Sequence, residues 1–194
     1  MAVLLVQVVA AKVWLHKKSI SMKKHILIVT LLFISSFGFA QKSISKLLKK
    51  HNTESVPYIS VQELAMPNAE TIILDSRELK EYEVSHIKNA IPVGYDHFNI
   101  KTVEEQVTDK SKTIVVYCSV GIRSENIGEK LKDAGYTNVY NLFGGIFEWK
   151  NNDFTVYDTN DEPTENVHTF SKEWSKWLTK GKKVYSKNIK KEND

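Results

Sequence analysis

Short apolar runs alternate with segments of helical pattern through the middle of the chain, and this alternation restricts the possible folds more than any other feature. The runs are apolar at consecutive positions, which is typical of strands that are covered on both faces. Such strands, separated by helical segments, indicate a parallel sheet. We therefore expect an α/β domain with helices on both faces of its sheet. The expected strands are 58–61, 71–75, 113–117 and 138–142; helices are expected within 62–70, 77–84, 101–109 and 144–152, and a turn-rich connection over 90–98.

The strongest strand pattern ends directly at Cys118, and another helical pattern follows a short loop. Ile127, Leu131 and Ala134 fall on one helical face, and Gly135 stands where a C-cap glycine belongs. Ligand sites in parallel sheets form beyond the carboxyl ends of the strands. Cys118 therefore lies where a functional site is expected.

The first 40 residues have the pattern of targeting segments. From Met22 the chain has a basic start, an apolar stretch and small residues before Gln41, which is the order of a secretory signal peptide over 22–40. The apolar stretch is short for a membrane-spanning helix, so an uncleaved anchor is the weaker interpretation. Residues 1–21 are interpreted as an upstream extension from a misplaced start. We expect a periplasmic or secreted protein that begins at Gln41, with a linker or short helix over 41–55.

Removal of this leader changes the charge of the chain. The sequence has 27 Lys and Arg against 23 Asp and Glu, and five of the lysines lie in residues 1–40, which contain no acidic residue. The remaining chain has 22 basic and 23 acidic side chains, a net charge of −1. This balance gives no support to nucleic-acid binding. A lipoprotein is excluded because the only cysteine, Cys118, is far from the cleavage site, and we expect no stable membrane insertion after cleavage.

Cys118 is followed by the residue types that lower the pKa of a thiol. Arg123 supplies a cation, and the N-terminus of the following helix directs its positive end at the sulfur. Gly121 allows the loop to turn without a Cβ clash, and Ser124 can cap the helix and offer its hydroxyl to the site. A single cysteine in an exported chain forms no internal disulfide, so it is either inert or reactive. The pattern favours a reactive thiolate over a small buried thiol.

Two stretches of the sequence, 73–93 and 113–149, resemble the rhodanese-type sulfurtransferases. The resemblance covers about residues 56–158 and implies a five-stranded parallel sheet with helices on both faces. Ser85 and Asn89 depart from it, because they stand where glycines are common in the family. The residues that carry the resemblance are Asp75, Arg77, Tyr82, the sequence Ser-His-Ile at 85–87, Cys118, Arg123, Gly144, Gly145 and Trp149.

The resemblance implies a sulfurtransferase that needs no cofactor and no metal. Cys118 would accept a sulfane sulfur from a donor such as thiosulfate and pass it, through a persulfide, to cyanide, a small thiol or a protein thiol. Arg123 would attract an anionic donor, and the backbone amides of 119–123 would stabilise the persulfide. Asp75 and Arg77 would support the active loop, and His86 would belong to a structural turn. The implied substrate-binding residues are Ser119, Val120, Gly121, Ile122, Arg123 and Ser124.

Two other functions remain open at this stage. Cysteine phosphatases and the related arsenate reductases hold their thiolate in a loop with five residues before the arginine, whereas four residues separate Cys118 from Arg123. The shorter loop favours a single sulfur over a tetrahedral oxyanion. The second alternative is a non-catalytic binding module of rhodanese-like fold in the periplasm, since one fold serves several functions.

Residues 159–194 lie outside the resemblance and are predicted to be a C-terminal extension with an amphipathic helix. Phe170, Trp174, Trp177 and Leu178 would form one face of that helix. We expect this face to pack on the domain, with a partner-binding or membrane-surface helix as the alternative. No function is predicted for the extension from the family resemblance.

Overall fold

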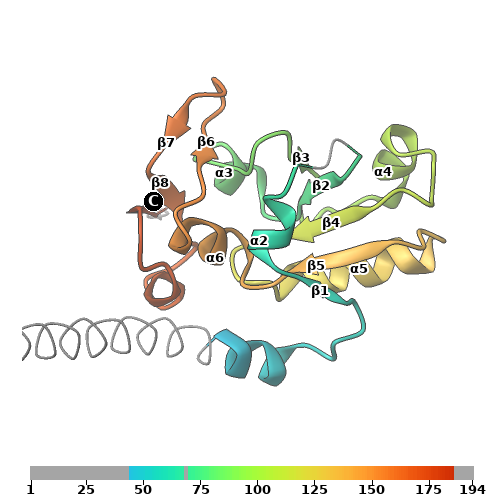
Figure 1. Ribbon diagram of the computed structural model, residues 1–194, viewed down its shortest axis with the longest axis horizontal. Helices are drawn as coiled ribbons and strands as arrows, with labels where there is room; N and C mark the ends of the chain where they lie inside the picture. The colour runs from blue at the N-terminus through green and yellow to red at the C-terminus, as the bar shows by residue number, and fades with distance from the viewer. Residues whose placement is uncertain (1–43, 68–69, 186–194) are drawn as a thin grey trace, which may run out of the picture. The chain divides into compact units, whose positions relative to one another are not determined.

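The computed structural model of the protein describes residues 44–67 and 70–185, and its centre is a parallel sheet. The strands are β1 (Tyr58–Ile59), β2 (Ile72–Asp75), β3 (Ile91–Pro92), β4 (Ile114–Tyr117) and β5 (Val139–Leu142). They pair in the order β1-β5-β4-β2-β3, all parallel (Figure 1). The predicted α/β fold with a five-stranded parallel sheet is confirmed.

Strand β3 is the element that the sequence pattern assigned to a turn-rich connection. It has two residues, Ile91 and Pro92, and pairs only with β2. Proline lacks an amide donor, so a strand containing it is restricted to the edge of a sheet. Because an edge strand of this length has no alternating apolar pattern, the sequence does not distinguish it from a loop.

Helices cover both faces of the sheet, as predicted, because side chains of each strand alternate between two apolar clusters. Val115 and Tyr117 of β4 point into one cluster, which contains residues of α2, α6 and the C-terminal extension. Ile114 and Val116 point into the other, which contains residues of α4 and α5. The helices are α2 (Val61–Leu64), α3 (Leu79–Tyr82), α4 (Ile100–Gln106), α5 (Arg123–Asp133) and α6 (Gly145–Asn151).

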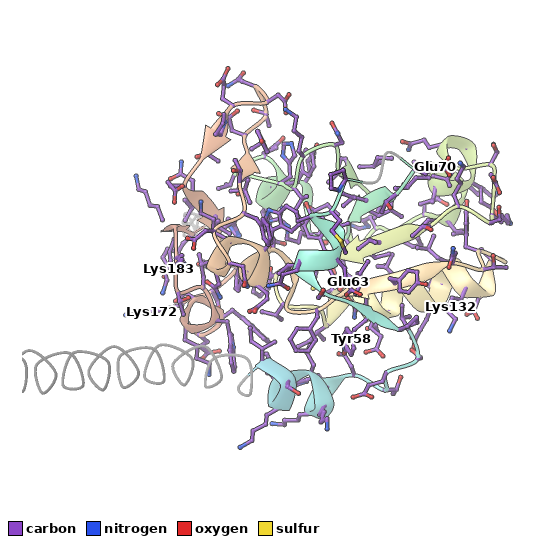
Figure 2. The ribbon with its side chains drawn as sticks, in the orientation of Figure 1. Tyr58, Glu63, Glu70, Lys132, Lys172 and Lys183 are labelled. Carbon is purple, nitrogen blue, oxygen red and sulfur yellow. The ribbon has the colours of Figure 1, made fainter. Side chains whose placement is uncertain are left out.

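The segment before β1 is helical over residues 44–51, one of the two forms predicted for 41–55. Ile44 and Leu48 are buried, so this helical segment packs on the domain. Asn52, directly after it, donates to the hydroxyl of Tyr58 on β1 at 2.8 Å; Figure 2 labels Tyr58 close to the segment. The predicted upstream extension and signal peptide lie outside the described residues. Within residues 44–67 and 70–185, none of the helices has the length and apolar character required to span a bilayer.

The C-terminal extension is not the amphipathic helix that its apolar spacing predicts. It forms β7 (Pro163–Thr164), which pairs antiparallel with the preceding β6 (Val156–Tyr157), and then β8 (Asn166–His168) and β9 (Lys182–Val184), a parallel pair. The only helical element between β8 and β9 is a single 3₁₀ turn, η1 (Trp174–Trp177). Phe170 has a φ of 58°, and a left-handed residue interrupts any right-handed helix at that position.

Candidate active site

Cys118 directly follows β4 and is 1 % exposed. The loop that follows curls back over its sulfur. The amide of Gly121 donates to Sγ at 3.1 Å, and the hydroxyl of Ser124 lies 3.6 Å from the same atom. Helix α5 begins at Arg123, so its positive N-terminal end also faces the thiol. Of the loop amides 119–123 that were predicted to stabilise the sulfur, the amide of Gly121 is therefore the one that donates to it.

Gly121 is required by the conformation of this loop. Its φ is 104°, which residues with a Cβ rarely adopt, and an added Cβ would lie 3.3 Å from the carbonyl oxygen of Leu142. With its amide turned to the sulfur, the Gly121 carbonyl points away and accepts hydrogen bonds at 2.8 Å from both Asn52 and Asn141. These two asparagines fix the orientation of the peptide that holds the sulfur.

Ser124 does not cap the helix, so one of the two roles predicted for it, helix capping, is wrong; its hydroxyl does lie at the site. The N-cap residue of α5 is Ile122, and Ser124 is the second residue of the helix. The Ser124 hydroxyl donates to Oδ1 of Asn141 at 2.7 Å, a shorter distance than the 3.6 Å to Sγ of Cys118. A hydroxyl has one proton, so Asn141 takes it in this arrangement.

Two other carbonyls of the loop are held by helix α6. The amides of Ile146 and Phe147 donate to the carbonyls of Cys118 and Ser119 at 2.9 and 3.1 Å. This close approach requires Gly145, where an added Cβ would lie 2.8 Å from the carbonyl of Ser119 and closer still to the carbonyl oxygen of Cys118. Gly145 of the glycine pair therefore allows α6 to reach the active loop.

Arg123 does not lie free above the sulfur, because it forms an ion pair with Glu81 of α3. Its two terminal nitrogens donate to the two carboxylate oxygens at 2.7 and 2.9 Å, and one of them also donates to the Ser119 hydroxyl at 3.1 Å. Glu81 is fully buried. Burial raises the pKa of the Glu81 carboxyl, but the hydrogen bonds and charge of Arg123 outweigh this effect, so that pKa lies below its ordinary value.

Glu81 is the functional residue that sequence reasoning missed. The only available signal was indirect: a cation placed beside a buried thiol requires a counter-ion, and three glutamates lie at 78, 81 and 83. A second unpredicted neighbour is His168 of the extension, whose Nδ1 lies 3.9 Å from the Glu81 carboxylate. Nδ1 of His168 accepts a hydrogen bond from the amide of Phe170 at 3.1 Å. In the neutral imidazole the proton is therefore assigned to Nε2.

The pKa of the Cys118 thiol lies below its ordinary value. Burial acts in the opposite direction, because it disfavours the charged thiolate. The charge of Arg123 and the hydrogen bonds from the backbone amides of Ser124 and Gly121 outweigh that penalty. The site therefore stabilises an anionic sulfur in a buried position.

Asp75 and Arg77 lie beneath the loop and do not line its opening. Their buried ion pair has a 2.6 Å contact, and Arg77 also donates to the carbonyl of Ser85 at 2.7 Å. The hydroxyl of Tyr117, the residue before Cys118, donates to Asp75 at 2.5 Å. The pair thus joins the carboxyl ends of β2 and β4 to the turn at 85–87, in keeping with the supporting position expected for it.

The turn at 85–89 is held by packing and backbone contacts within the fold. The imidazole of His86 stacks on Tyr82 at 3.9 Å between ring centroids, and its backbone pairs with Tyr157. Asn89 has a φ of 62°, the left-handed conformation that glycine commonly takes and that asparagine tolerates better than most residues. His86 does not line the cavity beside Cys118.

A cavity of about 130 Å³ opens beside the sulfur. Of the predicted substrate-binding residues, Ser119, Val120, Ile122 and Arg123 line it from the active loop, whereas Gly121 and Ser124 do not. Phe170 and Trp174 line it from the C-terminal extension, for which no function was predicted. Among the described residues, no cluster of three or more His, Cys, Asp or Glu side chains could hold a metal ion.

Comparison with known proteins shows what this segment is similar to. Residues 60–152 match the family model named Rhodanese, a rhodanese-like domain. The tRNA uridine(34) hydroxylase of Photorhabdus laumondii is 41 % identical over 87 residues, which are 43 % of this chain and 25 % of that protein. The protein of the same name from Erwinia tasmaniensis is 38 % identical over 87 residues, with the same coverage. The chain thus spans about a quarter of the length of these curated relatives.

The solved structures agree with the fold. The crystal structure of thiosulfate sulfurtransferase from Pseudomonas aeruginosa superimposes with a TM-score of 0.52 at 22 % identity, covering 72 % of this chain and 26 % of that chain. At this level of identity the likeness concerns the fold alone. Residues 60–152 therefore match a rhodanese-like domain and have its fold, with Cys118 at the carboxyl end of the central strand β4.

Proposed function

We propose that the protein is a sulfurtransferase that carries sulfane sulfur on Cys118 as a persulfide. The observation that supports it is the environment of the thiol: a buried sulfur whose pKa is lowered by Arg123, Ser124 and Gly121. The same donors suit a persulfide, which is also anionic. The cavity beside Cys118 gives a small donor access to it.

The reaction divides into two displacements at sulfur. In the first, the Cys118 thiolate attacks the outer sulfur of a donor such as thiosulfate; the new S–S bond forms as the donor's S–S bond breaks, and sulfite leaves with the electron pair. In the second, cyanide or a thiolate attacks the outer sulfur of the persulfide. Thiocyanate or a new persulfide leaves, and the thiolate of Cys118 is restored.

The competing functions have less support in the geometry. A phosphatase needs its loop arginine to bind the oxyanion, whereas Arg123 has both terminal nitrogens on the carboxylate of Glu81. The hydroxylase relatives share only a quarter of their length with this chain, so the match is too partial to support their reaction on tRNA for this protein. A non-catalytic module would not require a thiol with a lowered pKa.

Mass spectrometry of the intact protein after incubation with thiosulfate tests the proposal. We expect the mass of one added sulfur atom, located on Cys118 by peptide mapping, and its removal by cyanide with release of thiocyanate. Cys118→Ser should show neither event. Absence of the added sulfur and of thiocyanate with the wild-type protein would contradict the proposed function and leave the binding module as the better interpretation.

We also propose that this reaction takes place outside the cytoplasm. The proposal rests on the sequence of residues 22–40 alone, which lie outside the described part of the chain. N-terminal sequencing of the protein produced from its complete gene should give a chain that begins at Gln41. A product that begins at Met1 or Met22 would contradict export by this route.

A further inference from the structure

We propose that the C-terminal extension makes this site selective for an organic sulfur donor, one with an apolar group beside its sulfane sulfur and a single negative charge, over an inorganic dianion. The inference rests on the proposed sulfurtransferase function and specifies its donor. Three features of the described residues lead to it: the walls of the cavity, the conformation of Phe170, and the charge balance around Arg123.

The walls of the cavity are apolar on two sides. Val120 and Ile122 come from the active loop, and Phe170 and Trp174 come from the extension. The volume of about 130 Å³ is close to that of an engineered protein cavity of roughly 150 Å³ that binds benzene. A donor with a phenyl-sized group would therefore fill this space, whereas thiosulfate would leave apolar walls exposed to water.

Phe170 is held over the site in a conformation that its own backbone disfavours. Its φ is 58°, and its side chain is 53 % exposed, so burial in the core does not explain its position. Its amide is fixed by Nδ1 of His168, and its ring lies over the guanidinium of Arg123, 5.5 Å from Cζ to the ring centroid. Strained residues of this kind occur mainly where the surrounding structure positions them for function.

The charge of the site disfavours a dianion. Arg123 is the cation that lines the cavity, and the buried carboxylate of Glu81 balances it through two hydrogen bonds. With the thiolate of Cys118 included, the group has a net negative charge. Burial lowers the pKa of His168, so its imidazole adds no positive charge near neutral pH. Lys172, labelled in Figure 2, and Lys176 belong to the extension, but both are exposed, so water and salt screen them.

The test compares two donors with cyanide as the common acceptor: thiosulfate, and benzenethiosulfonate, which has a phenyl group and one negative charge. Thiocyanate release gives kcat/KM for each. We expect the wild-type protein to prefer benzenethiosulfonate by roughly tenfold or more, since a phenyl group would leave water. Phe170→Ala should lose most of that preference, because its benzenethiosulfonate value should fall by a larger factor than its thiosulfate value.

The variants are chosen so that a change in folding is not mistaken for a change in donor preference. Alanine at 170 keeps a Cβ, so the backbone strain is unchanged, and the removed side chain is half exposed. Met66→Ala, which removes a side chain that is 59 % exposed and does not line the cavity, should leave both values unchanged. Glu81→Gln removes the charge that balances Arg123 and should raise the thiosulfate value relative to benzenethiosulfonate.

The outcomes separate this inference from the proposed function. If thiosulfate loads Cys118 and is as good a donor as benzenethiosulfonate, the sulfurtransferase function stands and the donor selectivity is overturned. Equal losses with both donors in Phe170→Ala would show a structural role for this residue and would also overturn it. If neither donor loads sulfur onto Cys118, the proposed function fails and this inference fails with it.

Discussion

Substitution of Gly145 by alanine tests how the active loop is held. The new Cβ would lie 2.8 Å from the Ser119 carbonyl and nearer still to the Cys118 carbonyl oxygen, although real Cβ atoms essentially never come within 3.0 Å of such atoms. The loop or helix α6 has to shift, which breaks the hydrogen bonds from Ile146 and Phe147 at 2.9 and 3.1 Å. Two such bonds contribute about 2–3 kcal/mol. The left-handed φ of 56° adds about 1–2 kcal/mol for a residue with a Cβ.

We therefore expect Gly145→Ala to lower the free energy of unfolding by about 3–5 kcal/mol. Urea denaturation followed by fluorescence measures this change, and with an m value of about 1.5 kcal/mol/M the midpoint should fall by roughly 2–3 M. Gly94→Ala is the matched control. Gly94 has a φ of 68° and nothing within 4 Å of an added Cβ, so only the conformational cost of about 1–2 kcal/mol applies. Equal losses in the two variants would refute the close approach of α6 to the loop.

Two further predictions concern the charges of the site. The pKa of Cys118 is lowered, so its rate of alkylation by iodoacetamide should rise with pH through a midpoint below that of the same protein in denaturant. Arg123→Gln should move the native midpoint to higher pH. A native midpoint at or above the denatured one would contradict this prediction. Asp75→Asn removes one partner of the buried ion pair with Arg77 and should lower the free energy of unfolding by about 3–5 kcal/mol, measured by urea denaturation. The control is Lys112→Gln in the exposed ion pair with Glu70, which should lower it by about 0–1 kcal/mol. Similar losses in the two variants would show that the buried pair contributes no more than a surface one.

The parts of the fold that the sequence predicts well are those encoded by neighbouring residues. Strand β4 is apolar at consecutive positions because both faces are covered, and that pattern is visible in 113–117 alone. Helix α5 ends at Asp133 and is followed by Gly135 with a φ of 93°, as the C-cap pattern indicates. The active loop belongs to the same class, since only four residues separate Cys118 from Arg123.

The parts that sequence reasoning missed depend on which distant segments become neighbours. Asn141 lies on β5, and it reaches Gly121 and Ser124 only because β5 pairs with β4. Asn52 reaches the same loop from the helical segment before β1. Neither asparagine has a local pattern that separates it from the other asparagines of the chain.

The extension shows how a periodic pattern can arise without a helix. Trp174 and Trp177 lie in the 3₁₀ turn η1, and Leu178 follows it and is buried in the core. Phe170, at the start of the pattern, is instead half exposed over the active site. The four apolar residues recur at helical intervals, but this spacing does not indicate a helix here, because a different tertiary contact places each residue.

Arg123 illustrates the same distinction between neighbours in sequence and partners in space. Five positions after a reactive cysteine, a cation predicts a receptor for anionic donors, and the lowered pKa of Cys118 agrees with a positive charge nearby. Glu81, 42 residues away, changes the consequence of that charge, because a buried carboxylate with both oxygens on the guanidinium leaves little net attraction for a second anion. The thiolate still benefits, since it lies close to the cation, whereas a donor approaching from solvent meets the whole group. Under the proposed function, a site built in this way would activate its sulfur electrostatically and would select its donor by the apolar walls that Phe170 and Trp174 provide.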